Sequence, residues 1–304
     1  MKSRKGRTGS SGSGSEIQCH PLPLSCCEEP EILSLGNQGE FGMQHLLDLA
    51  TYPIDRPDSD ECKALIERCR ADLAAHGMYN LDGFLKPEVA QAAADDLKST
   101  MASAGFTHSR MHNIYFKKDL PDLAPDHPAL TRFQTVNHTL CADQLGASPV
   151  TEIYAWPPLV DFLAVTMGKR ALFAMDDPLA RINVMAYHEG ETLNWHFDRS
   201  EFTTTLLLQA PEAGGDFEYR TDLRTADNPN YEGVARLLRN EDPDLRAITP
   251  TPGALNVFRG INTPHRVTRI RGNRERMIAV FSYYDKPGVT FSEEERIGFY
   301  GRSA

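Results

Sequence analysis

The chain has 304 residues, of which 40% are hydrophobic and 24% are charged, so it can bury one large globular core or two small ones. Its formal net charge of -10 argues against nucleic-acid binding, because a protein that neutralises phosphates needs a basic face. No apolar run is long enough for a membrane span, and the opening MKSRKGRTGSSGSGS lacks the apolar region of a secretory signal, so we expect a cytoplasmic protein.

The N-terminal half predicts a leader followed by helices. Residues 1–43 are rich in Gly, Ser and Pro without a sustained period, which is typical of a disordered leader. Ser59 can cap a helix that ends at His76-Gly77, with apolar residues at helical spacing. A second helix is expected to begin at Pro87 and to end before Gly105. Residues 127–145 and 157–168 are predicted to be helical as well.

The second half predicts short strands separated by turn residues. The expected strands lie at 182–188, 202–210, 215–220, 253–260, 265–270 and 276–285, with a polar, partly helical insertion at 225–246. Strands at this spacing favour a sandwich of two sheets of the jelly-roll type. We therefore predict an α+β chain whose single catalytic domain, 44–304, has mainly helical support (44–180), a β core (181–285) and a closing segment (286–304).

The six cysteines predict neither a disulfide framework nor a zinc site. They include the adjacent pair Cys26-Cys27 and a pair seven residues apart, Cys62 and Cys69, but no CxxC motif with histidine partners. Reduced thiols are the expected state.

The stretch NWHFDRSEFTTTLLL carries the motif that points to chemistry. His196 and Asp198 are two positions apart beside a predicted strand, so both side chains can face one ion. His265 opens another predicted strand. Two imidazoles and one carboxylate on one face leave three positions of an octahedral ion free, the arrangement that non-haem iron(II) oxygenases need. Taken singly, each residue could instead be structural, and the spacing of His196 and Asp198 alone is a weak signal.

Arg276 adds a second feature of the same chemistry. It opens the apolar segment RMIAVFSYY, so its guanidinium could project inward and pair bidentately with a carboxylate. An oxygenase that chelates a 2-oxo acid needs such a group for the far end of the acid. A surface ion pair is the alternative role for this residue.

Two long segments resemble a known enzyme family. INVMAYHEGETLNWHFDRSEFTTTLLLQAPEAGGDFEYR and TPGALNVFRGINTPHRVTRIRGNRERMIAVFSYYDKPGVTFSEEERIGFYGR are similar to the iron(II)/2-oxoglutarate-dependent oxygenases. More narrowly, they resemble the BesD/HalD-like branch, which holds radical halogenases of free amino acids and related hydroxylases. The likeness extends over most of residues 44–302, including HNIYF at 112–116, and leaves out only the leader.

The resemblance implies a double-stranded β-helix and a set of cofactors. His196, Asp198 and His265 would bind Fe(II), Arg276 would hold the tail of 2-oxoglutarate, and O2 would be the oxidant. Arg274, two residues earlier, competes with Arg276 for that role. Asn183 could hydrogen-bond cofactor or substrate, although a structural amide is an equal alternative.

Asp198 predicts the reaction outcome within the branch. Halogenases of this kind carry a small residue in place of the carboxylate, which leaves a position for halide, whereas this chain has Asp198. We therefore expect hydroxylation of an unactivated C–H bond. Desaturation or ring formation stays open, because the same ligands support them.

The substrate is predicted from the resemblance. Relatives favour a free amino acid with a lysine-like or arginine-like side chain, and a carrier-bound or nucleoside-type substrate stays open. Side chains in the corresponding stretches that could line the pocket are Arg132, Asp177, Arg199, Ser282, Phe299 and Tyr300. Solvent exposure of the two arginines and terminal packing of the aromatic pair are the alternatives. We expect a small-molecule substrate, no nucleic acid and no membrane, and a homo-oligomer is compatible with the sequence.

Two other classes of function remain. A manganese or zinc hydrolase could use the same ligands but would not require Arg276. A binding module with structural histidines would leave Asp198 buried without a cation, which is costly.

Overall fold

The structure, a computed structural model, describes residues 42–121 and 123–304. The predicted leader therefore lies almost entirely outside the described residues. From Phe41 to Ala304 the chain forms one compact unit. Within the described part, no helix is both long enough and apolar enough to cross a membrane.

The first long helix begins and ends at the residues that the sequence predicts. Helix α1 spans Asp60–His76; the Ser59 hydroxyl accepts a hydrogen bond from the Cys62 amide, 3.1 Å away, and caps the first turn. Gly77 ends the helix with a φ of 71°, a left-handed conformation that glycine adopts without steric cost.

The remaining helices are shorter, except α2. Pro87 occupies the first turn of α2, as predicted, and the helix ends before Gly105. The predicted helix at 157–168 is confirmed as α4, and the insertion contains α5. These helices and the 3₁₀ turns are η1 (Met43–His45), α2 (Pro87–Ala104), η2 (Pro128–Leu130), η3 (Ala142–Gln144), α3 (Pro149–Ala155), α4 (Pro157–Thr166), α5 (Tyr231–Leu238) and α6 (Glu293–Tyr300).

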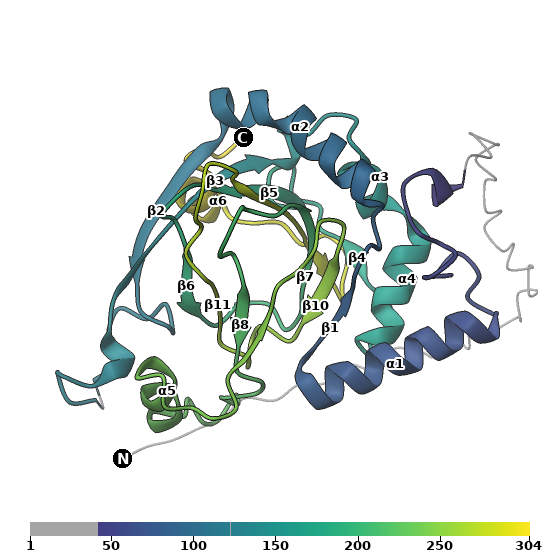
Figure 1. The fold of residues 1–304 in the computed structure, drawn as a ribbon. Coiled ribbons are helices and arrows are strands. Elements are labelled where there is room, and N and C mark those ends of the chain that lie inside the picture. The colour runs from purple at the N-terminus through teal and green to yellow at the C-terminus, as the bar shows by residue number, and fades with distance from the viewer. Residues whose placement is uncertain (1–41, 122) are drawn as a thin grey trace, which may run out of the picture. The chain divides into compact units, whose positions relative to one another are not determined.

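A seven-stranded antiparallel sheet dominates the fold (Figure 1), and its strand order is β1-β10-β7-β12-β5-β3-β2. The strands are β1 (Met78–Leu81), β2 (Phe106–His112), β3 (Phe133–Cys141), β5 (Ile182–Tyr187), β7 (Thr203–Gln209), β10 (Leu255–Phe258) and β12 (Arg276–Phe281).

The helical prediction for residues 127–145 is wrong. This segment is mainly the strand β3, flanked by single 3₁₀ turns. Its residues alternate between the two faces of the sheet, and pairing with β2 and β5 outweighs the weak helical pattern. In addition to its helices, the segment 44–180 supplies β1, β2 and β3 to the large sheet.

A four-stranded antiparallel sheet, ordered β6-β11-β8-β9, accompanies the large one. Its strands are β6 (Leu193–His196), β11 (His265–Val267), β8 (Phe217–Tyr219) and β9 (Arg246–Ile248), and a separate two-stranded ribbon pairs β4 (Phe173–Ala174) with β13 (Tyr283–Tyr284). One cluster of buried side chains joins the two larger sheets, including Tyr187, Leu207 and Ile278 from the large sheet and Phe217 and Val267 from the small one. The inner face of the large sheet therefore looks toward the small sheet.

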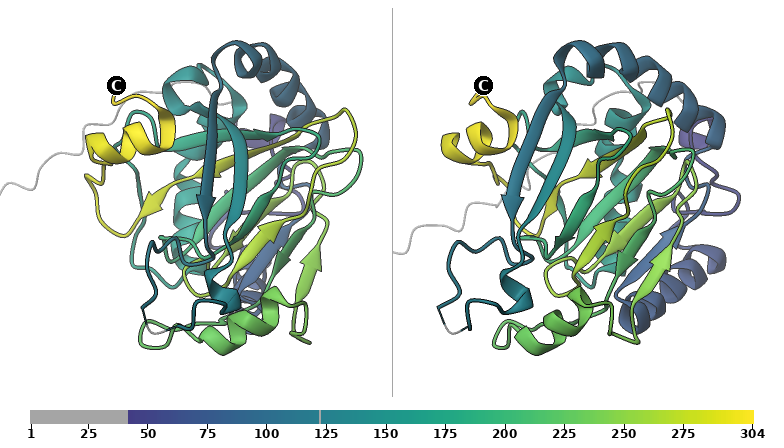
Figure 2. Two further views of the ribbon diagram at one scale, coloured as in Figure 1. Left: turned by 90° about the vertical axis from the view of Figure 1, so that its left-hand side faces the viewer. Right: turned by 60° about the vertical axis from the view of Figure 1, so that its left-hand side comes forward.

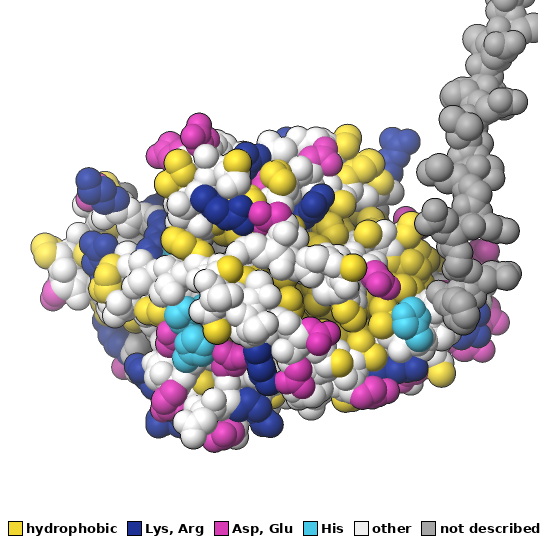
Figure 3. All heavy atoms as spheres, turned by 90° about the horizontal axis from the view of Figure 1, so that it is seen from above, with side chains coloured by type: hydrophobic (Ala, Val, Ile, Leu, Met, Phe, Trp, Pro, Cys, Tyr) yellow, Lys and Arg dark blue, Asp and Glu magenta, His cyan; other side chains and the backbone are white. Residues whose placement is uncertain are grey.

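The opposite face of the large sheet is covered by helices. Its outward side chains, such as Leu206, Val257 and Ala279, share the main hydrophobic cluster with residues of α1, α2, α3 and α4. Figure 2 shows the same arrangement from two sides, with α5 at one end of the strands and α6 beside the sheet edge. In Figure 3, acidic and basic side chains are interspersed on the face seen from above.

Candidate metal centre

His196, Asp198 and His265 come together where two strands of the small sheet meet. His196 ends β6, His265 begins β11, and these two residues are direct partners in the antiparallel register. Their rings lie 4.2 Å apart between centroids. Asp198 Oδ1 lies 3.3 Å from His196 Nε2 and 3.6 Å from His265 Nε2. The sequence motif thus becomes a compact set of two imidazoles and one carboxylate.

Both imidazoles are oriented by backbone carbonyls. His196 Nδ1 lies 2.8 Å from the Asn194 carbonyl, and His265 Nδ1 lies 3.0 Å from the Thr263 carbonyl. Because a carbonyl oxygen can only accept, Nδ1 must carry the proton in each ring, and Nε2 presents its lone pair. Both Nε2 atoms face the Asp198 carboxylate, as shared ligation of one ion requires.

The Asp198 carboxylate has a place built for it. Thr203 donates a hydrogen bond of 2.6 Å to Oδ2, which leaves Oδ1 directed at the imidazoles. Gly260 packs against the carboxylate, and its carbonyl accepts a hydrogen bond from the Asp198 amide. A Cβ at position 260 would lie 2.7 Å from Asp198 Cβ, closer than side-chain carbons approach. Glycine at position 260 therefore makes room for the side chain of residue 198.

The charge states of Asp198 and His265 suit a cation. Burial raises the pKa of Asp198. The nearby His265 and His196 and the hydrogen bond from Thr203 lower this pKa by more than burial raises it, so the net pKa falls below its ordinary value. Burial lowers the pKa of His265 to about 4, despite the opposing effect of Asp198. At neutral pH the carboxylate is ionised and His265 is neutral, which is the ligand form of each.

Aromatic rings surround the imidazoles. Phe258 and Phe217 lie 4.7 and 5.4 Å from the His265 ring, and Phe116 lies 5.6 Å from the His196 ring. His112 stacks on Phe116 at 4.4 Å, and burial lowers its pKa. These rings limit the access of water to the three ligand atoms, which strengthens electrostatic interactions there.

Arg276 is buried on the inner face of the large sheet. Its side chain is next to Tyr187, its partner in the register with β5, and the guanidinium lies 5.9 Å from the Tyr187 ring. Burial lowers the pKa of Arg276 to about 10, so the group stays charged at neutral pH. Among the described residues no carboxylate pairs with it, and Tyr187 is the neighbour whose charge acts against the effect of burial on its pKa. A buried guanidinium without an anion is costly, so this group is prepared for an anionic ligand.

The two other predicted cofactor residues have different surroundings. Arg274 is exposed and donates a hydrogen bond to the Pro211 carbonyl. Asn183 is buried on the inner face, where its amide nitrogen donates to the Leu179 and Ile182 carbonyls. Its Oδ1 accepts a hydrogen bond from the Tyr300 hydroxyl. These contacts favour the structural alternative for Asn183.

Asp177, Ser282 and Tyr300 hold the C-terminal segment. Asp177 is fully buried; Oδ1 accepts from the Leu179 and Ala180 amides, and Oδ2 accepts from the Phe291 amide and the Arg296 guanidinium. The Ser282 hydroxyl donates to the Ala180 carbonyl, and Tyr300 bonds Asn183. Their polar groups are thus engaged within the protein, and a role in substrate binding stays a prediction.

Arg132, Arg199 and Phe299 lie nearer the surface. Arg132 is exposed and donates to the Met111 carbonyl. The Arg199 side chain is 69% exposed and forms an ion pair of 2.8 Å with Glu295 of α6. Phe299, also on α6, stacks with His108 of β2 at 6.3 Å. Helix α6 therefore links the loop after Asp198 to the edge strand β2.

Thr203, Gly260 and Asn137 belong to the surroundings of the site but escaped the sequence analysis. Asn137, on β3, has its Oδ1 buried without a hydrogen-bond partner on the inner face, beside Tyr187 of the neighbouring strand β5. The alternation of Thr135, Asn137 and Thr139 with bulkier residues was the available signal for an inward polar face. The helical interpretation of residues 127–145 concealed it.

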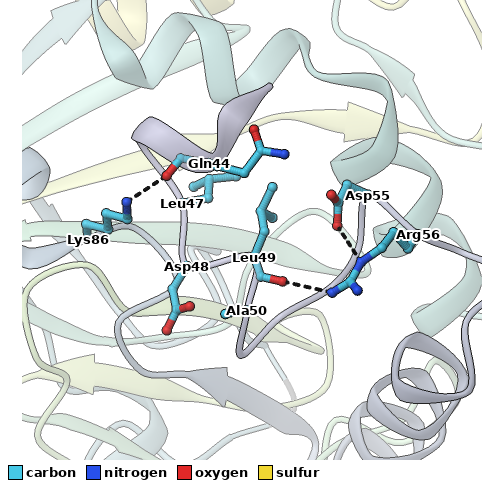
Figure 4. A pocket seen from close by; sticks show the side chains of 8 residues that line it. All are labelled: Gln44, Leu47, Asp48, Leu49, Ala50, Asp55, Arg56 and Lys86. Carbon is cyan, nitrogen blue, oxygen red and sulfur yellow. Dashed lines mark hydrogen bonds and ion pairs between the residues drawn. The ribbon is translucent and has the colours of Figure 1, made fainter. Parts of the chain in front are cut away.

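A separate hollow of about 420 Å³ lies near the beginning of the described chain (Figure 4). Its cations are already engaged, because Lys86 donates to the Gln44 carbonyl and Arg56 to the Leu49 carbonyl. None of the three candidate metal ligands lines it. It is therefore not an alternative location for the metal chemistry.

The donor set fits iron(II). Two imidazole nitrogens and one carboxylate oxygen form the facial ligand set that leaves positions open for a chelating 2-oxo acid and dioxygen. The carbonyl groups that fix both ring tautomers and the threonine that fixes the carboxylate provide the supporting hydrogen bonds that metal ligands need.

Comparison with solved structures gives several proteins with low sequence identity. An oxidoreductase of the 2OG-Fe(II) oxygenase family from Burkholderia pseudomallei is 15% identical, with 74% of this chain and 92% of that chain covered and a TM-score of 0.44. A Pseudomonas putida prolyl-4-hydroxylase is 16% identical, with coverage of 71% and 97% and a TM-score of 0.44. The α-ketoglutarate-dependent epimerase SnoN from nogalamycin biosynthesis is 12% identical, with coverage of 73% and 84% and a TM-score of 0.49. TM-scores below 0.5 do not by themselves establish a shared fold.

Comparison with sequences gives a clear assignment. No curated protein matches the chain. The family model described as halogenase D (HalD) matches residues 62–293, which include every candidate metal ligand and Arg276. This chain therefore belongs to the halogenase D family and is an iron(II)/2-oxoglutarate-dependent oxygenase.

Proposed function

We propose that the protein hydroxylates an unactivated C–H bond of a small polar molecule, a free amino acid, with His196, Asp198 and His265 as the iron ligands. One observation carries the choice of hydroxylation, namely the Asp198 carboxylate beside the two imidazoles. Thr203 orients this carboxylate by a hydrogen bond, and Gly260 leaves space for the side chain at position 198. A carboxylate ligand occupies the position that a halogenase leaves to halide.

Each side chain has a defined task in this proposal. The Nε2 atoms of His196 and His265 and Asp198 Oδ1 bind the ion, while the Asn194 and Thr263 carbonyls hold both rings in the tautomer that binds metal. Arg276 pairs with the distal carboxylate of 2-oxoglutarate. Iron(II), when bound together with 2-oxoglutarate and dioxygen, supplies the oxidant that attacks the C–H bond. The rings of Phe116, Phe217 and Phe258 exclude water around it.

The charges near the site favour a substrate with a carboxylate. Arg224 lies over the Phe197 ring at 3.9 Å; burial lowers its pKa, and the charge of Asp198 acts in the opposite direction. The guanidinium of Arg110, on the edge strand β2, lies 4.9 Å from the Phe116 ring, which is next to His196. Every free amino acid offers a carboxylate to such cations. The preference for a lysine-like or arginine-like side chain rests on the relatives alone.

The fold is interpreted as a double-stranded β-helix in a cytoplasmic enzyme. Two antiparallel sheets enclose the inner cluster, and the metal ligands lie at the end of β6 and the start of β11. Both features suit a jelly-roll core with its site between the sheets.

Halogenation is the second candidate, because the matching family is described as halogenase D. Product mass separates the two functions. Turnover of the same amino acid in the presence of chloride should add the mass of one oxygen, and a chlorine isotope pattern in the product would instead support halogenation. Asp198→Gly is the matched variant, because it removes the carboxylate. If the wild type oxygenates the amino acid and the variant does not, the oxygenation requires the Asp198 carboxylate.

A further inference from the structure

A second group of metal-ligand side chains lies on the outer face of the large sheet. His138 of β3, His188 just after β5, and Glu191 in the turn before β6 place one donor atom each within 4.8 Å of one another. The group is separate from the iron site, because His138 pairs with Ala186, on the face of the sheet opposite Tyr187 and Arg276. The group is accessible to ions: the His188 side chain is 48% exposed, and Glu191 borders an open hollow of about 280 Å³.

His138 presents one ring nitrogen to the group. Its Nδ1 lies 2.9 Å from the Thr107 hydroxyl, and its Nε2 lies 3.0 Å from Glu191 Oε1. A hydroxyl can donate or accept, so Thr107 can also accept the Nδ1 proton and free the Nε2 lone pair for a cation.

His188 is held by a carboxylate from another strand. Glu275, the residue before β12, lies 3.0 Å from His188 Nε2 and accepts its proton. Nδ1 is then the unprotonated nitrogen and faces Glu191 Oε2 at 4.0 Å. A carboxylate behind a ligating histidine is the arrangement that fixes the tautomer in zinc sites.

Glu191 completes the set. Its Oε2 accepts a hydrogen bond of 2.8 Å from the His188 amide, which fixes the carboxylate between the two rings. The rings themselves lie 4.3 Å apart between centroids.

We propose that His138 Nε2, His188 Nδ1 and the Glu191 carboxylate bind a divalent d-block ion of the zinc class, with Thr107 and Glu275 as supporting hydrogen-bond partners. Two histidines and one glutamate with an open fourth position are an established zinc ligand set. The ion joins β3, the β5–β6 turn and, through Glu275, the start of β12. It therefore stabilises the segment that carries Arg276 from the face opposite the iron site.

Zinc stoichiometry tests this proposal. The full-length apoprotein is dialysed against low-micromolar ZnCl2, and bound zinc is measured by inductively coupled plasma mass spectrometry. Cys19, His20, Cys26 and Cys27 in the remainder of the chain could also bind zinc, so the readout is the difference from wild type. His188→Ala should bind one zinc ion fewer than wild type, and zinc should raise its melting temperature less.

Two further variants make the result specific. Glu191→Gln, which keeps size and shape, should also lose one ion, and far-UV circular dichroism checks the fold of each variant. His45 is an exposed histidine that belongs to neither group of metal ligands, so His45→Ala should bind as much zinc as wild type. The proposal is overturned if His188→Ala and Glu191→Gln, both folded, retain the wild-type zinc content.

The iron site gives an independent comparison. In the same zinc assay, His265→Ala should lose a different zinc ion, the one held by the candidate iron ligands. The double variant His188→Ala/His265→Ala should therefore lose two. Loss of zinc with His265→Ala but not with His188→Ala would reject the second site and leave the iron ligands unaffected. The opposite result would reject the iron ligands and retain the second site.

Discussion

Replacing Arg276 by Met should weaken 2-oxoglutarate binding and, at the same time, stabilise the apoprotein. The guanidinium is buried without an ion-pair partner among the residues that the structure describes, and burial lowers its pKa to about 10 from 12.5. Methionine removes the charge but keeps much of the volume. Binding and folding should therefore change in opposite directions, which a purely structural arginine would not produce.

The magnitudes follow from the energy of a buried charge. Removing one partner of a buried charge pair costs about 2–5 kcal/mol. Taking ~3 kcal/mol, the KM for 2-oxoglutarate should rise roughly 100-fold, at about 1.4 kcal/mol per tenfold. When folding lowers the pKa of a basic group, the folded protein with that group charged is destabilised at every pH below the folded-state pKa. At neutral pH the full penalty applies, about 3 kcal/mol for this shift, so the apoprotein should gain on the order of 1–3 kcal/mol.

The assay is a titration of 2-oxoglutarate with succinate as readout, together with urea unfolding of the apoprotein. Arg276→Lys keeps the charge but loses the planar fork, so it should be intermediate. Arg274→Met is the matched control, since Arg274 is exposed and bonds only the Pro211 carbonyl. An unchanged KM in Arg276→Met would refute the reasoning, and a raised KM in Arg274→Met alone would transfer the role to Arg274.

Three further substitutions and one labelling experiment test separate parts of the account. Asp198→Ala should abolish hydroxylation and leave the circular-dichroism spectrum intact; wild-type turnover would reject Asp198 as a ligand. Gly260→Ala should lower iron retention on dialysis, because its Cβ would lie 2.7 Å from Asp198 Cβ, whereas Gly298→Ala, with open space around it, should not; equal retention in both would contradict the packing argument. Ser59→Ala should lower the free energy of unfolding by about 1 kcal/mol through loss of the α1 cap, as measured by urea unfolding, and no loss would show that the cap is not stabilising. Burial raises the pKa of the Cys69 thiol to about 12, so the thiolate is scarce and iodoacetamide at pH 8 should modify Cys69 only after unfolding; peptide mass spectrometry that finds rapid native labelling would contradict this.

The parts of the fold that the sequence predicts well are those with local signals. Ser59 and Gly77 mark the ends of α1, and Pro87 marks the start of α2, because capping depends on nearby residues. The strand β3 was missed because its pairing partners, β2 and β5, are distant in the chain or were not recognised as strands. Tertiary pairing, which no local window contains, decides such a segment.

The metal ligands were predictable for a similar reason, and the pocket was not. His196 and Asp198 are neighbours in the chain, and the third ligand opens a strand with a clear pattern. The support from Thr203 and Gly260 depends on side-chain packing that sequence spacing does not reveal. The candidate substrate residue Asp177 has all its observed contacts within the C-terminal segment and the loop before β5, which only the three-dimensional structure could show.

Anaerobic reconstitution with iron(II) and 2-oxoglutarate, followed by exposure to air with each of the common amino acids, tests the central claim most directly. The account predicts the absorption band of the iron–2-oxoglutarate chelate, then succinate formation that depends on one amino acid, and a product heavier by one oxygen. The absence of both the chelate band and succinate would contradict it. A chlorinated product in the presence of chloride would reject hydroxylation and retain the iron site.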